Sequence, residues 1–110
     1  MAQASLDLLG IRQTPAERVA QLAGLAKDAG MTGLVCSSHE VALLRERFGD
    51  HFQLVTPGVR PAGSAAGDQK RIMTPAQAKQ VGSNFIVVGR PIYASQEPAA
   101  VVASINAELA

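Results

Sequence analysis

The sequence predicts a single α/β domain over residues 1–110, with parallel strands in the order α-β-α-β-α-β-α. Short apolar runs alternate with longer amphipathic segments, which is typical of βαβ units with right-handed crossovers. The apolar runs are continuous, as in strands covered on both faces or in a barrel wall. The chain also contains a weak internal repeat, in which a cap is followed by a helix, a glycine, a strand and a polar turn. The two copies are TPAERV…DAGMTGLVCSS and TPAQAKQVGSNFIVVGR.

The first expected helix spans residues 15–28. Thr14 is a suitable N-cap, Pro15 suits the first helical position, and Glu17 completes a capping box. Gly30 is a plausible stop. The apolar stripe of this helix is formed by residues at helical spacing, namely Val19, Leu22, Ala23 and Ala26.

A buried strand is expected over residues 32–38, an apolar run bounded by glycine and serine. Ser37 and Glu40 form a second capping box that opens a helix reaching Phe48, and Gly49 ends it. The buried face of that helix is expected to comprise Val41, Leu44 and Phe48.

The second strand is expected at residues 53–56, where Pro57 and Gly58 terminate it. The segment 58–73 has three glycines and few apolar residues, and loops of this length are often functional or disordered.

The last third of the chain repeats the same signals. Thr74, Pro75 and Gln77 begin a short helix that Gly82 closes, and a third strand is expected at residues 85–88. The final helix is expected at residues 98–109, with an apolar side made of Val101, Val102, Ile105 and Leu109.

Composition narrows the function classes. The net charge of +1 predicts neither a nucleic-acid nor a membrane partner, and one Tyr without Trp argues against a stacking platform for single strands. The single cysteine, Cys36, excludes an internal disulfide and fits a reducing compartment. No apolar run approaches the ~20 residues of a membrane helix. The start of the chain lacks a signal-peptide pattern, so a soluble cytoplasmic protein is expected.

Function in parallel α/β proteins lies at the carboxyl ends of strands, and three segments qualify here: 37–39, the loop after Thr56, and 89–91. Residues 89–91 suit a phosphate-binding site. Gly89 would let a phosphate oxygen approach backbone N–H groups, and the turn that follows can offer a helix N-terminus, which favours anions. Arg90 adds a planar, positively charged guanidinium that can bind phosphate oxygens. The alternative is a glycine turn with a surface arginine.

The loop 58–73 carries Arg60 and the segment 68–71, and a basic, glycine-rich loop could close over a ligand. A solvated flexible loop is the alternative. Cys36 is expected in the core, and His39 and His51 on the surface. No spacing of ligands suggests a metal site.

Two segments of the chain then resemble a known family. They are similar to the C-terminal part of bacterial orotidine 5′-phosphate decarboxylases, and they read LVTPGVRPAGSAAGDQKRIMTPAQA and, after it, FIVVGRPI. The likeness extends from about Leu9 onward and implies strands six to eight of a (β/α)8 (TIM) barrel. A complete barrel typically needs ~250 residues, so strands one to five are absent here.

The resemblance also implies roles. Arg90 would grip the 5′-phosphate beside the Gly89 backbone, Gln69 would reach across phosphate and pyrimidine, and Arg60 would open a mobile phosphate-gripping loop at 58–73. Pro57 and Val35 would wall the apolar side of the pyrimidine pocket.

The resemblance further implies decarboxylation without metal or cofactor, by a Lys/Asp array with a D-x-K-x-x-D core in a homodimer. This chain contains no D-x-K-x-x-D, because Met73 stands where the second acid would follow Asp68 and Lys70. No catalytic residue is therefore expected here. The alternatives are a sugar-phosphate epimerase or lyase barrel, and a non-catalytic fragment that oligomerises to cover an apolar sheet face and two edges.

Overall fold

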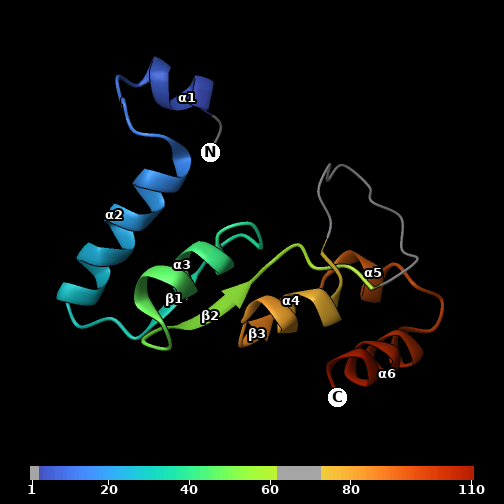
Figure 1. Ribbon diagram of the computed structural model, residues 1–110. Helices are drawn as coiled ribbons and strands as arrows, with labels where there is room; N and C mark the ends of the chain where they lie inside the picture. Colours follow the sequence, from blue (N-terminus) through green and yellow to red (C-terminus); the bar gives the residue numbers. More distant parts are fainter. Residues whose placement is uncertain (1–2, 62–72) are drawn as a thin grey trace.

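The computed structural model describes residues 3–61 and 73–110 (Figure 1). The elements, in chain order, are α1 (Gln3–Leu8), α2 (Pro15–Asp28), β1 (Gly33–Val35), α3 (Val41–Phe48), β2 (Gln53–Thr56), α4 (Pro75–Val81), β3 (Phe85–Ile86), α5 (Arg90–Tyr93) and α6 (Pro98–Leu109). The predicted alternation of helices and strands is confirmed, and two short helices, α1 and α5, are added to it.

The three strands form one parallel sheet in the order β1-β2-β3. Val35 of β1 lies beside Val55 of β2, which in turn lies beside Phe85 of β3. The predictions for β1 (32–38) and β3 (85–88) were too long, since regular pairing covers only three and two residues. Single backbone bonds continue the pairing past the strand ends, from Cys36 N–H to the Val55 carbonyl and from Val87 N–H to the Thr56 carbonyl.

Two helices begin where their caps predict. The Thr14 hydroxyl accepts from the Glu17 N–H at 3.1 Å at the start of α2. At the start of α4 the complete capping box of Thr74 and Gln77 is present, and Gly82 ends the helix in the left-handed region at φ 110°.

The predicted box at Ser37 and Glu40 forms only in part. The Glu40 carboxylate accepts from the Ser37 N–H at 3.0 Å, but α3 begins at Val41 instead of directly after Ser37. A turn at residues 38–40 intervenes, because the Glu40 N–H donates to the Ser37 carbonyl.

Helix α1 was not expected from the sequence. Its six residues are too few to show a helical period, and no polar side chain caps its start in the described part of the chain. Leu6 is nevertheless buried, so tertiary packing holds this helix.

The core lies between one face of the sheet and the helices α2 and α3. Its buried members are Ala23, Cys36, Val41, Leu44, Phe52 and Leu54, with Val19, Leu34, Phe48 and Val81 packed against them. This confirms the predicted buried face of α3, whereas Leu22 of α2 is half exposed. Cys36 is buried, as expected.

The other face of the sheet is apolar and open among the described residues. Val35, Val55 and Phe85 share it by register, and Val87 follows by alternation. Val35 is 74% exposed, Phe85 59% and Val87 50%. The strands were expected to be covered on both faces or to line a barrel, and here only the helix-facing side is covered.

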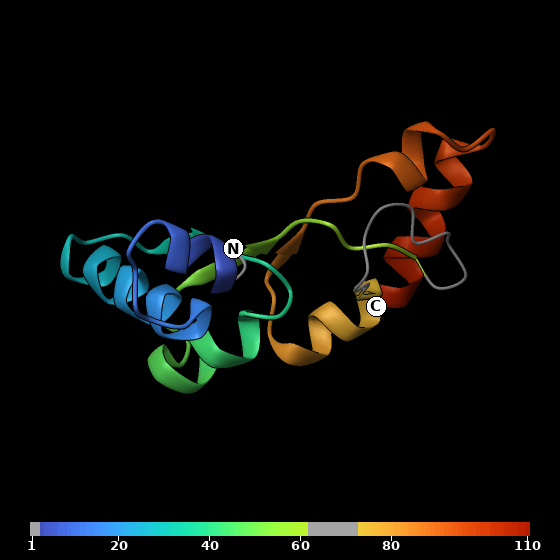
Figure 2. The same cartoon turned by 90° about the horizontal axis from the view of Figure 1, so that it is seen from above.

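The molecule is elongated. Helices α1, α2 and α3 gather at one end and α4, α5 and α6 at the other, with the sheet between them (Figure 2). The radius of gyration is 15.6 Å, against about 13 Å for a compact domain of this length. No helix in the described ranges is both long and apolar enough to cross a membrane.

Arg45 of α3 joins four segments at the amino ends of the strands. Its guanidinium donates to the carbonyls of Gly49, Phe52 and Gly82 and to the Asn84 side chain, at 2.6–3.0 Å. The same Asn84 oxygen accepts from the Leu54 N–H at 2.8 Å. One side chain therefore links the ends of α3 and α4 to the starts of β2 and β3.

Candidate functional site

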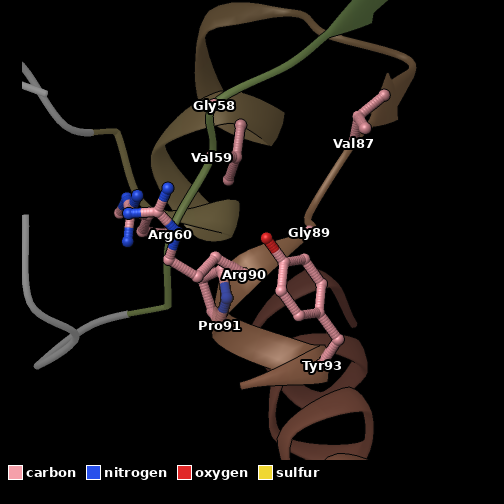
Figure 3. Close-up of a pocket in the computed structure, with 8 residues that line it drawn as sticks. All are labelled: Gly58, Val59, Arg60, Val87, Gly89, Arg90, Pro91 and Tyr93. Atoms are coloured by element: carbon pink, nitrogen blue, oxygen red, sulfur yellow. The ribbon is translucent and has the colours of Figure 1, made fainter. Parts of the chain in front are cut away.

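A pocket of about 240 Å³ lies at the carboxyl ends of β2 and β3 (Figure 3). One side comes from the segment after β2 and the other from the end of β3 and from α5. The lining residues are Gly58, Val59, Arg60, Val87, Gly89, Arg90, Pro91 and Tyr93. Two of the three strand ends that the sequence analysis selected thus meet in one place.

Arg60 is positioned by backbone pairing. After β2, Gly58 adopts φ 73°, a conformation that favours glycine, and turns the chain. Val59 then forms a parallel bridge with Met73, and the Arg60 N–H donates to the Met73 carbonyl at 3.1 Å. Because Val59 is fully buried, this pairing anchors Arg60 at the rim of the pocket.

Gly89 and Arg90 form the opposite rim. The N–H groups of Ile92 and Tyr93 both donate to the Gly89 carbonyl, and Pro91 has no N–H. The backbone donors that this turn can direct at an anion are therefore those of Gly89 and Arg90. The Arg90 side chain is exposed and adds a permanently charged guanidinium.

The chemistry of the lining suits a small anion. Two arginines face one cavity, and none of its lining residues is acidic. The volume lies below the ~300–1,000 Å³ of pockets for drug-sized ligands, so it fits a single small group. A guanidinium pairs with phosphate oxygens in bidentate fashion, and backbone N–H groups complete such sites.

The other predicted site residues lie elsewhere. Val35 and Pro57 are exposed and are not among the residues that line the pocket; Val35 lies on the open apolar face of the sheet. Segment 37–39 is not part of the lining either. Gln69 and most of the predicted loop 58–73 fall outside the described residues.

Tyr93 is a lining residue that the sequence analysis did not select. It follows Arg90 by three positions, which places both on one side of the short helix α5. The α5 helix itself was expected only as a turn, so this spacing carried no signal in advance.

The model of the orotidine 5′-phosphate decarboxylase / HUMPS family matches residues 2–105. The chain is 56% identical over 107 residues to an orotidine 5′-phosphate decarboxylase of Haemophilus ducreyi, and 50% identical over 110 residues to one of Pseudoalteromonas atlantica. These matches cover 96% and 100% of this chain, and 46% and 48% of the relatives.

Solved structures agree with the sequence matches. The crystal structure of orotidine 5′-phosphate decarboxylase from Lactobacillus acidophilus superposes with a TM-score of 0.81 at 39% identity, over 99% of this chain and 44% of that one. The orotidine 5′-monophosphate decarboxylase of Sulfolobus solfataricus has a TM-score of 0.63 at 18% identity, covering 82% of this chain and 40% of that one. This second likeness shows the fold alone.

The chain thus spans somewhat less than half the length of the curated relatives, corresponding to their C-terminal part. The solved relatives are (β/α)8 barrels, so the three-stranded parallel sheet is part of a barrel wall. This confirms the predicted fold class.

Proposed function

Because the chain belongs to the orotidine 5′-phosphate decarboxylase / HUMPS family, we propose that the whole protein converts orotidine 5′-phosphate to uridine 5′-phosphate and carbon dioxide. The names of the relatives support this reaction. The observation that carries the role of this segment is the pocket in which Arg60, Gly89 and Arg90 meet.

In this proposal the pocket binds the 5′-phosphate. Arg90 supplies the charged fork, the Gly89 and Arg90 N–H groups approach the phosphate oxygens, and Arg60 adds a second positive charge from the opposite rim. The phosphate lies far from the carboxylate that is lost, so its binding energy serves the transition state from a distance. Gln69 is proposed to contact phosphate and pyrimidine, and Val35 and Pro57 to wall the pyrimidine.

We assign no catalytic residue to this chain. The sequence has no D-x-K-x-x-D motif, and a decarboxylase of this kind needs an acid to protonate the carbanion left by carbon dioxide. The 110-residue chain is therefore expected to be inactive by itself. The whole enzyme is proposed to be a cytoplasmic homodimer, in keeping with the family resemblance and with a free cysteine.

The test is a calorimetric titration of the chain with uridine 5′-phosphate, with the Arg90→Ala variant and the matched control Arg47→Ala. Arg47 is exposed on α3 and does not line the pocket. Saturable binding that only Arg90→Ala abolishes would support the proposal. Tighter binding of sugar phosphates than of uridine 5′-phosphate would favour an epimerase or lyase of the same barrel type instead.

In a complete enzyme, Arg90→Ala is expected to lower kcat/KM by 10²–10³-fold, about 3–4 kcal/mol, on the scale of removing one preorganised charged contact. The loss arises because the phosphate keeps its negative charge while the pocket loses half of its arginines. Kinetics with orotidine 5′-phosphate measure it. An unchanged kcat/KM would remove Arg90 from the phosphate site.

The open apolar face supports a second role for the isolated chain, that of a non-catalytic segment that associates. Val35, Phe85 and Val87 are each at least half exposed on one face, and burying such a face is favourable by about 25 cal/mol per Å². We expect light scattering to show oligomers, and Phe85→Ser to shift them toward monomer. Val102→Ser is the control, because Val102, which was expected on the apolar side of α6, is exposed in the structure. A wild-type monomer that unfolds cooperatively would contradict this role.

A further inference from the structure

Tyr93 lies in the pocket and has no role in the proposed phosphate contacts. Its side chain is 72% exposed, although a large aromatic ring on a helix usually packs against apolar neighbours. Figure 3 shows the ring rising from α5 beside Gly89, with the hydroxyl directed into the pocket toward Val59. An exposed phenol that points into a cavity lined by two arginines is placed to meet a ligand.

The backbone fixes this position. The Tyr93 N–H donates to the Gly89 carbonyl at 3.2 Å, so the residue starts from a defined place one turn after the glycine. A Cβ added at Gly89 would lie 3.5 Å from Cε1 of the ring, which is van der Waals contact. The ring therefore stands against the Gly89 backbone, where the phosphate is proposed to bind.

The chemistry of a phenol fits that neighbour. The hydroxyl donates one hydrogen bond, and phosphate oxygens accept strongly when charged. A tyrosine has two side-chain torsions, so ordering it costs less conformational entropy than ordering a third arginine. A neutral donor also adds a contact without further repulsion between cations.

We propose that Tyr93 is a specificity-determining residue of this pocket, whose hydroxyl donates a hydrogen bond to a phosphate oxygen of the ligand, an assignment that rests on the phosphate-binding function proposed above. Arg60 and Arg90 supply charge, and Tyr93 supplies a directional contact. The pocket thereby favours a phosphate monoester, whose three terminal oxygens can engage both arginines and the phenol, over a planar carboxylate, which has two oxygens and less negative charge.

The chain offers a direct probe of this contact. It contains one tyrosine and no tryptophan, so its intrinsic fluorescence reports on Tyr93 alone. Ribose 5-phosphate does not absorb where tyrosine is excited, which makes it the ligand for this titration. We expect a saturable change in emission with ribose 5-phosphate and none with ribose. Calorimetric binding without any change in emission would overturn the assignment.

The decisive variant is Tyr93→Phe, which removes only the hydroxyl and keeps the ring against Gly89. Calorimetry with uridine 5′-phosphate is expected to show about tenfold weaker binding or more, the scale of one hydrogen bond to a charged group. Binding of acetate, measured by competition, should change less than twofold. Circular dichroism spectra that match the wild type would exclude a general loss of structure.

The two proposals fail in different ways. If Arg90→Ala abolishes binding but Tyr93→Phe binds as the wild type does, the Tyr93 assignment is wrong and the phosphate site stands. If both variants bind uridine 5′-phosphate as tightly as the wild type, or the wild type itself does not bind, both proposals are overturned. A tenfold loss in Tyr93→Phe with loss of binding in Arg90→Ala supports both.

Discussion

Replacing Arg45 with alanine tests how the amino ends of the strands are held together. The guanidinium makes five hydrogen bonds at 2.6–3.0 Å to the carbonyls of Gly49, Phe52 and Gly82 and to Asn84. A hydrogen bond to a charged group contributes about 1.5–3 kcal/mol. The five bonds belong to one half-buried side chain, so water can replace some of them, and their energies do not add.

We therefore expect Arg45→Ala to lower the free energy of unfolding by about 3 kcal/mol, since at least the Phe52 and Gly82 carbonyls lose a partly buried donor. Arg45→Lys keeps the charge but offers three donors from one point, so about 1–2 kcal/mol should be lost.

Urea unfolding followed by circular dichroism, at one fixed protein concentration, measures these differences. The fixed concentration matters because association would shift the midpoint. Arg47→Ala, two residues along the same helix and exposed, is the control and should change stability by less than about 0.5 kcal/mol. Equal stability of the Arg45→Ala and Arg47→Ala variants would refute the view that Arg45 ties the segments together.

Three further outcomes are expected. Gly82→Ala should destabilise the fold by about 1–2 kcal/mol, because φ is 110° and the new Cβ would lie 3.0 Å from Cγ of Arg45. Gly24→Ala, at an open position inside α2, should stabilise the fold by about 0.5–1 kcal/mol. Thermal unfolding compares the two variants. Thr74→Ala should cost about 1 kcal/mol by removing the cap of α4, whereas Thr74→Ser should be near neutral in the same assay. Burial, with help from the Glu40 carboxylate, raises the pKa of the Cys36 thiol above its ordinary value of 9.0. The thiol therefore loses its proton at lower pH in the unfolded chain than in the folded one. The free energy of unfolding should fall as the pH rises above about 9. Chemical unfolding from pH 7 to 10 should show a shallower fall for Cys36→Ala, and identical slopes would contradict the shift.

The helix boundaries were the most predictable part of the fold. Thr14 and Thr74 are caps whose partners lie three residues away, so the signal is complete within one turn, and both helices start as expected. The strand limits were less accurate. Residues at the ends of β1 and β3 are as apolar as those inside, and only the neighbouring strand decides how many of them pair.

The candidate site was likewise predictable in part, where it depends on local sequence, and not where it depends on packing. The rule that parallel strands present functional residues at their carboxyl ends predicts the segments of Arg60 and Arg90 from the sequence alone. It could not show that the Val59–Met73 bridge sets one rim, or that a short helix brings Tyr93 to the other. Val35 lies on the open sheet face and does not line this pocket, so its proposed place beside the pyrimidine stays a prediction.

The local sequence is thus sufficient to predict the α/β class, the order of the elements, the helix caps and the two arginines of the pocket. Each of these predictions depends on residues a few positions apart. Motif spacing added the family. The bridging role of Arg45 and the shared apolar face of the three strands arise only when segments distant in sequence pack together. The contact of the Tyr93 ring with Gly89 depends on the direction of one side chain. Such contacts depend on the register of three strands and on the direction of individual side chains, and a linear pattern encodes neither.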